Sequence, residues 1–288
     1  MERRHPARRR AAPRRVTRRR ATKRDRRLSS RAVRMSPRFH EEQGGMPDDR
    51  RHLAIFDLDD TLLDGDCTGL WIAWLVRRRW VEDGEAFMEQ VARHDQQYHA
   101  GTLDMQAHLR FVLAPLVGRR HDTVRDEVVA FVETWIRPRL MPGALERLAW
   151  HRDQGHDTLI ISASMYHLVE PIAREVGADD ALATPPAFDA EGRFTGEPTG
   201  IVTYQSGKLT ALEAWLAERE AARARPDILW GYSDSYNDLP LLEHVDHAHA
   251  TQPDARLARV AEQRGWPRFD WRNAGATSTK GAKASPSW

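Results

Sequence analysis

Short apolar runs alternate along this chain with longer stretches in which apolar residues recur at the helical period of three to four positions. The run at 52–58 is β-branched and aromatic with charged residues on both sides, so it predicts a fully buried strand. Further strands are expected at 158–161, 181–184, 228–232 and 249–251. Because helical stretches separate these runs, the sequence predicts an α/β fold with a parallel, doubly wound sheet.

Between the first two core strands the pattern is helical only. Residues 66–140 hold no comparable strand, and their apolar positions predict amphipathic helices around 71–75, 87–98, 103–113 and 124–136. This block is therefore an all-helical insert after the first core strand. Beyond it we expect a hairpin over 188–194 at the sheet edge, and helices at 144–154, 168–176, 209–221, 239–245 and 255–263.

Charge divides the chain into unlike parts. Residues 1–45 carry 17 of the 44 Lys and Arg and only four acids, a formal charge of +13, whereas the remainder carries −11. This leader is poor in apolar residues, should not fold alone, and lacks the apolar stretch of a secretory signal. It fits an Arg-rich transit peptide, a nucleic-acid-binding arm, or an untranslated stretch before a start at Met35 or Met46.

The remaining composition is that of a globular protein. Apolar residues make up 41% of the chain, and there are ten tryptophans, enough for a substantial core. No run of roughly eighteen apolar residues is present, so no membrane span is expected. Cys67 is the only cysteine, which excludes an internal disulfide and fits a reducing compartment such as the cytoplasm.

Side chains that can carry chemistry follow the predicted strands or begin a helix. The candidates are Asp57 and Asp59 after the first strand, Ser162 after the second, Lys208 at a helix start, and Asp234, Asn237 and Asp238 after strand 228–232. Taken one at a time, each of these residues could instead belong to a turn, cap a helix or be an ordinary surface lysine. Together they would meet at the carboxyl edge of one parallel sheet, where open α/β proteins bind ligands. The paired carboxylates suit a hard cation and phosphate chemistry.

Four segments resemble the motifs of the haloacid dehalogenase superfamily: Asp57–Thr61 (DLDDT), Ile160–Ser162 (IIS), Gly207–Lys208 (GK) and Asp234–Asp238 (DSYND). The resemblance implies a Rossmann-like core, formed by 46–65 and 141–272. The insert at 66–140 resembles the C1-type helical cap of the phosphoserine-phosphatase-like subfamily IB. Segments such as 171–173 and 192–196 look closest to a bacterial branch that includes histidinol-phosphate phosphatases. The tail at 273–288 is rich in Gly, Ser and Lys, and we expect it to be disordered.

The resemblance also implies a mechanism. Asp57 would be the nucleophile that forms an aspartyl-phosphate, while Asp59 would protonate the leaving alkoxide and then deprotonate the attacking water. Mg²⁺ would be held by the carboxylates of Asp57 and Asp234 and by the main-chain carbonyl of Asp59. The resemblance assigns phosphate contacts to Ser162, Lys208 and Asn237. It assigns supporting contacts to Thr61 and to Asp238, which would pair with Lys208.

Candidates for substrate binding lie at the cap. Asp66 matches the acid that phosphoserine phosphatases use for a substrate ammonium, and an N-cap is an equal explanation. Ungapped matching places Val112 where that group has a carboxylate-gripping arginine, with Arg110 two residues away. This departure favours a substrate without a carboxylate. Three cap histidines could contact an imidazole or be ordinary surface residues: His94, His99 and His108.

The leading hypothesis is a Mg²⁺-dependent phosphomonoesterase for a small, amine-bearing phosphorylated metabolite. L-histidinol phosphate comes first and phosphoserine second, which connects the protein with histidine or serine biosynthesis. An enzyme that transfers the phosphoryl group to an alcohol instead of water would contain the same motifs, so phosphotransfer is an alternative activity. A hypothesis of a different class is a nucleic-acid-associated protein that uses the basic leader as its binding arm.

Overall fold

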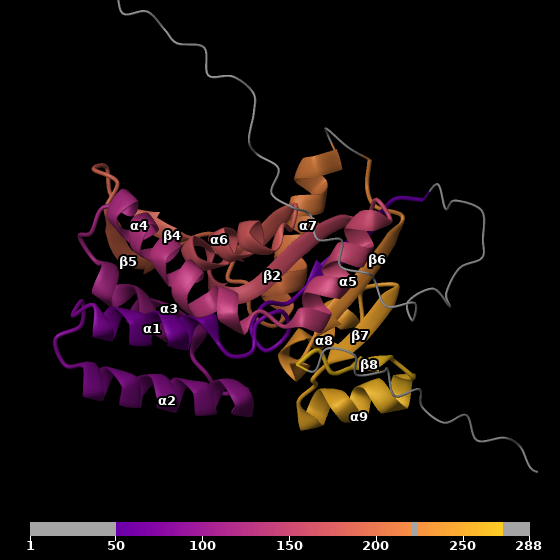
Figure 1. Cartoon of the computed structure of the whole chain (residues 1–288), viewed down its shortest axis with the longest axis horizontal. Coiled ribbons are helices and arrows are strands. Elements are labelled where there is room, and N and C mark those ends of the chain that lie inside the picture. The colour runs from indigo at the N-terminus through magenta and orange to yellow at the C-terminus, as the bar shows by residue number, and fades with distance from the viewer. Residues whose placement is uncertain (1–49, 221–223, 273–288) are drawn as a thin grey trace, which may run out of the picture. The chain divides into compact units, whose positions relative to one another are not determined.

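The structure is a computed structural model that describes residues 50–220 and 224–272 of the 288. Its centre is a parallel six-stranded sheet with the order β3-β2-β1-β6-β7-β8 (Figure 1). The strands are β1 His52–Phe56, β2 Asp157–Met165, β3 Asp180–Thr184, β6 Ile228–Ser233, β7 His247–Thr251 and β8 Arg268–Phe269. The predicted doubly wound α/β sheet is confirmed. Because the chain builds outward from β1 first to β3 and later to β8, a ligand crevice is expected at the carboxyl ends beside β1.

Alternation along β1 shows how both faces of the sheet are covered. Leu53 and Ile55 belong to one hydrophobic cluster, and Ala54 and Phe56 belong to another. The first cluster is closed by α7, α8 and α9, and the second by α5, α6 and the inserted helices. These helices are α5 Pro142–Asp153, α6 Tyr166–Val176, α7 Ser206–Glu220, α8 Leu239–Leu242 and α9 Ala255–Arg264.

The insert between β1 and β2 is helical, as expected, and its helices lie together beside the sheet (Figure 1). It consists of α1 Cys67–Arg77, α2 Gly84–Ala100, α3 Met105–Leu113 and α4 His121–Phe131, with the short segments η2 Ala114–Leu116, η3 Val132–Ile136 and η4 Arg137–Arg139. Trp71 of α1 packs edge-on against Phe131 of α4, with ring centroids 5.2 Å apart. Both rings belong to the cluster that contains Phe56, so the insert and the sheet share one hydrophobic core.

The predicted hairpin is present, but it does not lie at the edge of the main sheet. Strands β4 Pro186–Phe188 and β5 Phe194–Pro198 form a separate antiparallel sheet instead of extending the edge of the main one. Phe194 accepts a backbone hydrogen bond from Gly118 and donates one to Arg119, both after η2. Its side chain is buried, so the hairpin covers the insert. Strand β8, with two residues, was too short for its pattern to predict.

None of the helices within 50–220 and 224–272 combines the length and the apolar character needed to cross a membrane. The predictions for the leader at 1–45 and for the tail at 273–288 lie outside the described residues.

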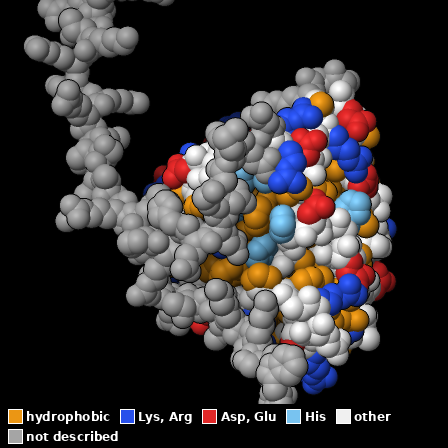
Figure 2. Space-filling view, turned by 90° about the vertical axis from the view of Figure 1, so that its right-hand side faces the viewer, with side chains coloured by type: hydrophobic (Ala, Val, Ile, Leu, Met, Phe, Trp, Pro, Cys, Tyr) orange, Lys and Arg blue, Asp and Glu red, His pale blue; other side chains and the backbone are white. Residues whose placement is uncertain are grey.

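A group of histidines surrounds Trp230 of β6 on the face of the sheet that α5 covers. Its members, all in ring contact with Trp230, are His52, His151, His156, His247 and His249. Figure 2 shows a face on which histidine side chains stand among hydrophobic ones. Burial, and secondarily the charge of Arg147, lowers the pKa of His151 to about 2 and that of His249 to about 3.

These buried histidines predict that the fold is sensitive to acid. Because their pKa values are depressed in the folded state, the unfolded chain takes up protons first as the pH falls below the ordinary value of 6.5, and stability is lost. We expect His151 and His249 each to lower the free energy of unfolding by about 1.4 kcal/mol between pH 7.5 and 5.5. Urea titrations at both pH values measure this loss. His249→Gln should reduce it by about 1.4 kcal/mol, and an unchanged pH dependence would contradict the assignment.

Candidate active site

Loops from distant parts of the chain meet at the carboxyl edge of the sheet beside β1. Asp57 follows β1, Lys208 lies in the first turn of α7, and Asp238 follows β6. The Lys208 ammonium nitrogen lies 2.8 Å from Asp57 Oδ1 and 2.7 Å from Asp238 Oδ2. All three side chains are buried. The structure therefore gathers these predicted residues into one charged cluster, including the expected pairing of Asp238 with Lys208.

The backbone before α7 explains why a lysine can enter this cluster. Gln205 adopts a positive φ of 51°, and a Cβ on Gly207 would stand 1.9 Å from the carbonyl oxygen of Val202. Only glycine fits there, so the chain can turn tightly and direct Lys208 inward. Burial opposes the charge of Lys208, but the two carboxylates outweigh it and raise the pKa above its ordinary value. The lysine stays cationic, a suitable partner for phosphoryl oxygens.

Asp57, which is buried, and Asp234, which is half-buried, are two acids that repel each other. Burial, with the nearby Asp238 and Asp59 carboxylates, raises the pKa of Asp57 to about 7 even though Lys208 lowers it. Burial and the charge of Asp57 raise the pKa of Asp234 well above its ordinary value. Such mutually repelling oxygen ligands fit a divalent cation, whose charge would offset theirs.

Thr61, predicted as a supporting residue, forms two hydrogen bonds with Asp234. Its hydroxyl donates to Asp234 Oδ1 at 3.2 Å and accepts from the Asp234 backbone N–H at 3.1 Å. Thr251, at the end of β7, donates in turn to the Thr61 hydroxyl at 3.4 Å. Three strand ends are thereby joined by hydrogen bonds at the acid pair.

Both carboxylate oxygens of Asp59 are held. Oδ1 accepts from the Cys67 backbone N–H at 2.6 Å, and Oδ2 accepts from the Ser164 hydroxyl at 2.8 Å and the Ser162 hydroxyl at 3.3 Å. Ser162, predicted as a phosphate contact, therefore points to the predicted general acid. Strand β2 does not end at Ser162 but continues to Met165.

The sequence did not lead us to Ser164 as a site residue, although the alternation of side chains along a strand could have indicated it. Residues two apart on a strand share a face, so a strand through Ser162, Ala163 and Ser164 presents both serines to the same site. Strand β2 also shows a register irregularity against β3 between Ile161 and Met165, at the point where these serines occur.

Asn237 connects the core to the cap. Its Nδ2 donates to the Tyr98 carbonyl oxygen at 3.4 Å, and its Oδ1 accepts from Gln205 at 3.3 Å. The Tyr98 ring, from α2, lies 5.5 Å from that of Tyr204. Burial, and then the site carboxylates beginning with Asp238, raise the pKa of Tyr98 well above its ordinary value. A protonated phenol thus stands beside the acids, in a position that no pattern in the cap sequence indicated.

Asp66 borders solvent at the start of α1 and caps it, accepting from the N–H groups of Thr68 and Gly69 at 2.9 and 2.8 Å. The surrounding protein, and then the charge of Asp59, raise the pKa of Asp66 to about 7. Asp66, Asp59 and Cys67 place ligand atoms within 4.8 Å of one another. Because burial keeps the Cys67 thiol protonated by raising its pKa, this trio is a poor metal site.

The other cap candidates have partners within the cap or on the hairpin. Arg110 is exposed and its Nε donates to Glu197 of β5 at 2.7 Å, so the structure directs this guanidinium to the hairpin. His94 and His108 face each other with their Nδ1 atoms 2.9 Å apart, while the exposed His99 lies 3.3 Å from Asp95. Substrate contacts by these four residues stay predictions.

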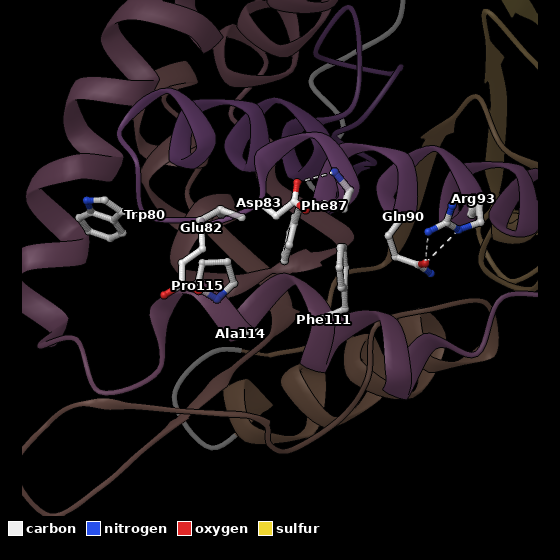
Figure 3. A pocket seen from close by; sticks show the side chains of 11 residues that line it. Trp80, Glu82, Asp83, Phe87, Gln90, Arg93, Phe111, Ala114 and Pro115 are labelled. Carbon is white, nitrogen blue, oxygen red and sulfur yellow. Dashed lines mark hydrogen bonds between the residues drawn. The ribbon is translucent and has the colours of Figure 1, made fainter.

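A separate cavity of about 520 Å³ lies in the cap between the α1–α2 loop, α2 and α3 (Figure 3). Phe87 and Phe111 stack at its wall with ring centroids 4.1 Å apart. None of the predicted site residues lines it. The predicted site residues at the carboxyl edge of the sheet are therefore separate from this cavity.

Comparisons with known proteins identify the family of this chain. The family described as haloacid dehalogenase-like hydrolase matches residues 54–243. A histidinol-phosphatase from Neisseria meningitidis serogroup C (strain 8013) is 34% identical over 217 residues, 75% of this chain and 97% of that protein. Phosphoserine phosphatase SerB1 of Mycobacterium tuberculosis (strain ATCC 25618 / H37Rv) is 32% identical over 237 residues, 79% of this chain and 73% of that protein.

Among solved structures, a protein with unknown function from Bordetella pertussis Tohama I is 30% identical and aligns with a TM-score of 0.71. The alignment covers 77% of this chain and 99% of that one. Because the family match spans more than half of the chain, the protein belongs to the haloacid dehalogenase-like hydrolases.

Proposed function

We propose that this hydrolase removes phosphate from L-histidinol phosphate through an aspartyl-phosphate intermediate, with Mg²⁺ as its cofactor. The chain is a phosphoric monoester hydrolase of its family. The observation that carries the proposal is the convergence of Asp57, Asp59, Lys208 and Asp234 at one edge of the sheet.

The chemistry divides into two transfers. A carboxylate oxygen of Asp57 attacks phosphorus, and the bond from phosphorus to the substrate oxygen breaks while Asp59 gives that oxygen a proton. Asp59 then takes a proton from water, which attacks the aspartyl-phosphate and restores the Asp57 carboxylate with release of phosphate. Lys208 offsets the charge on the phosphoryl oxygens throughout.

The carboxylates of Asp57 and Asp234 and the main-chain carbonyl of Asp59 would hold Mg²⁺. Bound there, the cation supplies positive charge that offsets the phosphate and the buried acids.

Thr61 provides a test of this metal site. Thr61→Val keeps the shape of the side chain but removes the hydroxyl that orients Asp234. We expect the Mg²⁺ concentration for half-maximal activity to rise about 10- to 100-fold. Activity measured across a Mg²⁺ series after treatment with EDTA checks this. Thr210→Val, which changes an exposed threonine on α7, is the matched control. An unchanged Mg²⁺ requirement in Thr61→Val would contradict the site.

Charge around the cap entrance supports an amine-bearing substrate without a carboxylate. The surrounding protein, then the charge of Asp59 and, least, that of Asp95 raise the pKa of Asp66, so an ammonium brought there would relieve repulsion. Arg110 donates its Nε to Glu197, which partly neutralises its charge and makes it a weaker partner for a substrate carboxylate. The rings of Tyr98 and Tyr204, tilted by 41° to each other, offer aromatic faces for an imidazole.

Asp66→Asn tests the amine contact. Asparagine is as good an N-cap residue as aspartate, so its single side-chain oxygen keeps one of the two capping hydrogen bonds of α1 while the negative charge is lost. We expect kcat/KM for L-histidinol phosphate to fall about 10- to 100-fold, because a charge-assisted hydrogen bond contributes roughly 1.5–3 kcal/mol. Hydrolysis of p-nitrophenyl phosphate, which has no amine, should change little. Equal losses on both substrates would contradict an amine contact.

Phosphoserine is the second candidate, since SerB1 is similar over 79% of this chain. Comparing kcat/KM for L-histidinol phosphate and O-phospho-L-serine, with and without EDTA, decides between the two substrates. An added acceptor alcohol in the same assays shows whether phosphate passes to water or to the alcohol.

The nucleic-acid hypothesis rests on residues 1–45, outside the described residues. It predicts salt-sensitive retention on RNA or DNA that disappears when these residues are removed. The buried Cys67 is compatible with the cytoplasmic location that we propose.

A further inference from the structure

Ser164, which lies outside the four family motifs, is at the centre of a hydrogen-bond network. Its hydroxyl donates to Asp59 Oδ2 at 2.8 Å. The Thr68 hydroxyl stands 2.9 Å from the Ser164 oxygen, and the Cys67 thiol donates to the same oxygen at 3.3 Å. Ser164 is in β2, whereas Thr68 and Cys67 are in the first turn of α1. The network therefore joins the sheet, the root of the cap and the predicted general acid.

The capacity of a hydroxyl fixes the direction of these bonds. A serine oxygen has one hydrogen to donate and two lone pairs to accept with. Because Ser164 uses its hydrogen for the carboxylate of Asp59, it accepts from both Thr68 and Cys67. A hydroxyl group that accepts hydrogen bonds becomes a stronger hydrogen-bond donor, so the bond from Thr68 strengthens the bond from Ser164 to Asp59.

Ser162 cannot replace Ser164 in this position during the reaction. The Ser162 hydroxyl is 3.3 Å from Asp59 Oδ2, and as the proposed phosphate contact it would turn towards a bound phosphoryl group. Ser164 and the Cys67 backbone N–H would then be the groups that hold the two oxygens of Asp59. Without the Ser164 hydroxyl, only the Cys67 backbone N–H would hold the carboxyl group, which could then rotate about its last bond, away from the leaving oxygen.

We infer that Ser164, supported by Thr68, is a positioning residue that holds the Asp59 carboxyl group in the orientation from which it protonates the leaving oxygen. The inference rests on the proposed function only in assigning that proton transfer to Asp59. It does not depend on which phosphomonoester is the natural substrate.

Two substrates whose leaving groups differ in their need for a proton test this positioning role of Ser164. Benzyl phosphate releases an alkoxide that needs a proton, whereas p-nitrophenyl phosphate releases a stable phenolate that does not. For Ser164→Ala we expect kcat/KM to fall about 10- to 100-fold on benzyl phosphate and less than about threefold on p-nitrophenyl phosphate. Thr68→Val should lower the ratio of kcat/KM on benzyl phosphate to kcat/KM on p-nitrophenyl phosphate by a smaller factor than Ser164→Ala does. Thr68→Val provides the test if Ser164→Ala does not fold. Ser164→Thr, which keeps the hydroxyl, should restore the ratio.

Thr210→Val removes an exposed hydroxyl that bonds to the Ser206 carbonyl, and it should leave the ratio at the wild-type value. Equal losses on both substrates, or no loss on either, in Ser164→Ala and Thr68→Val would overturn the positioning role. Wild-type protein that hydrolyses both synthetic esters but not L-histidinol phosphate would refute the proposed substrate instead. The ratio would still decide the role of Ser164.

Discussion

Asp57→Asn is expected to lower kcat by about 10⁴-fold or more on every phosphomonoester, because an amide cannot form the aspartyl-phosphate. Stability should not fall with activity. Burial and the charges of Asp238 and Asp59 raise the pKa of Asp57, so its carboxylate is held at a cost that the neutral amide avoids. Asparagine can also accept the hydrogen bond from Lys208. Phosphate release and thermal unfolding, measured on the same preparation, check both statements.

Two outcomes would contradict this assignment. Residual turnover near the wild-type rate would show that another group is the nucleophile. A large drop in melting temperature would instead mean that the lost activity reflects unfolding. Asp64→Asn, at an exposed acid after β1 that pairs with Arg272, is the matched control and should retain activity.

Lys208→Met should lose both activity and stability. The lysine is 1% exposed and neutralises two buried carboxylates, those of Asp57 and Asp238. Removing one side of a buried ion cluster typically costs about 3–5 kcal/mol, because the remaining charge is left without compensation. The penalty relative to wild type should shrink as the pH falls, since a protonated Asp57 carries no charge to compensate. Urea unfolding at several pH values measures both effects.

Arg137→Met is the control for Lys208→Met. Arg137 also forms an ion pair, with Glu175, but its side chain is 53% exposed. Solvent screens such pairs, so the unfolding midpoint should hardly move. If Lys208→Met proved as stable as Arg137→Met, the lysine would not be the electrostatic centre of the site.

The core strands were predictable because their signal is local. Strand β1 is apolar at every position after His52, is buried along its whole length and lies between charged residues, as expected of a fully buried strand. Parallel strands place all their carboxyl ends at one edge, so the order of acids, serine and lysine along the sequence already implied a common site. The motifs of the family then gave Asp57, Asp59, Lys208 and Asp234 their expected roles.

What sequence could not supply are contacts between segments far apart in the chain. Ser164 meets Thr68 across 96 positions, Arg110 meets Glu197 across 87, and Asn237 meets Tyr98 across 139. No periodic pattern encodes such a pairing, because it depends on how the cap and the hairpin pack against the sheet. The misplaced hairpin has the same cause, since its strands were evident but the surface that buries Phe194 was not.

The sequence by itself determined the class of the fold, the helical insert and the candidate residues for attacking and binding a phosphate. These depend on local periodicity and on the fixed direction of parallel strands. Only the tertiary structure decided which groups hold Asp59, which cap side chain stands over the acids, and where Arg110 is directed. The physical reason is that side-chain orientation is set by packing and hydrogen bonding across the whole core.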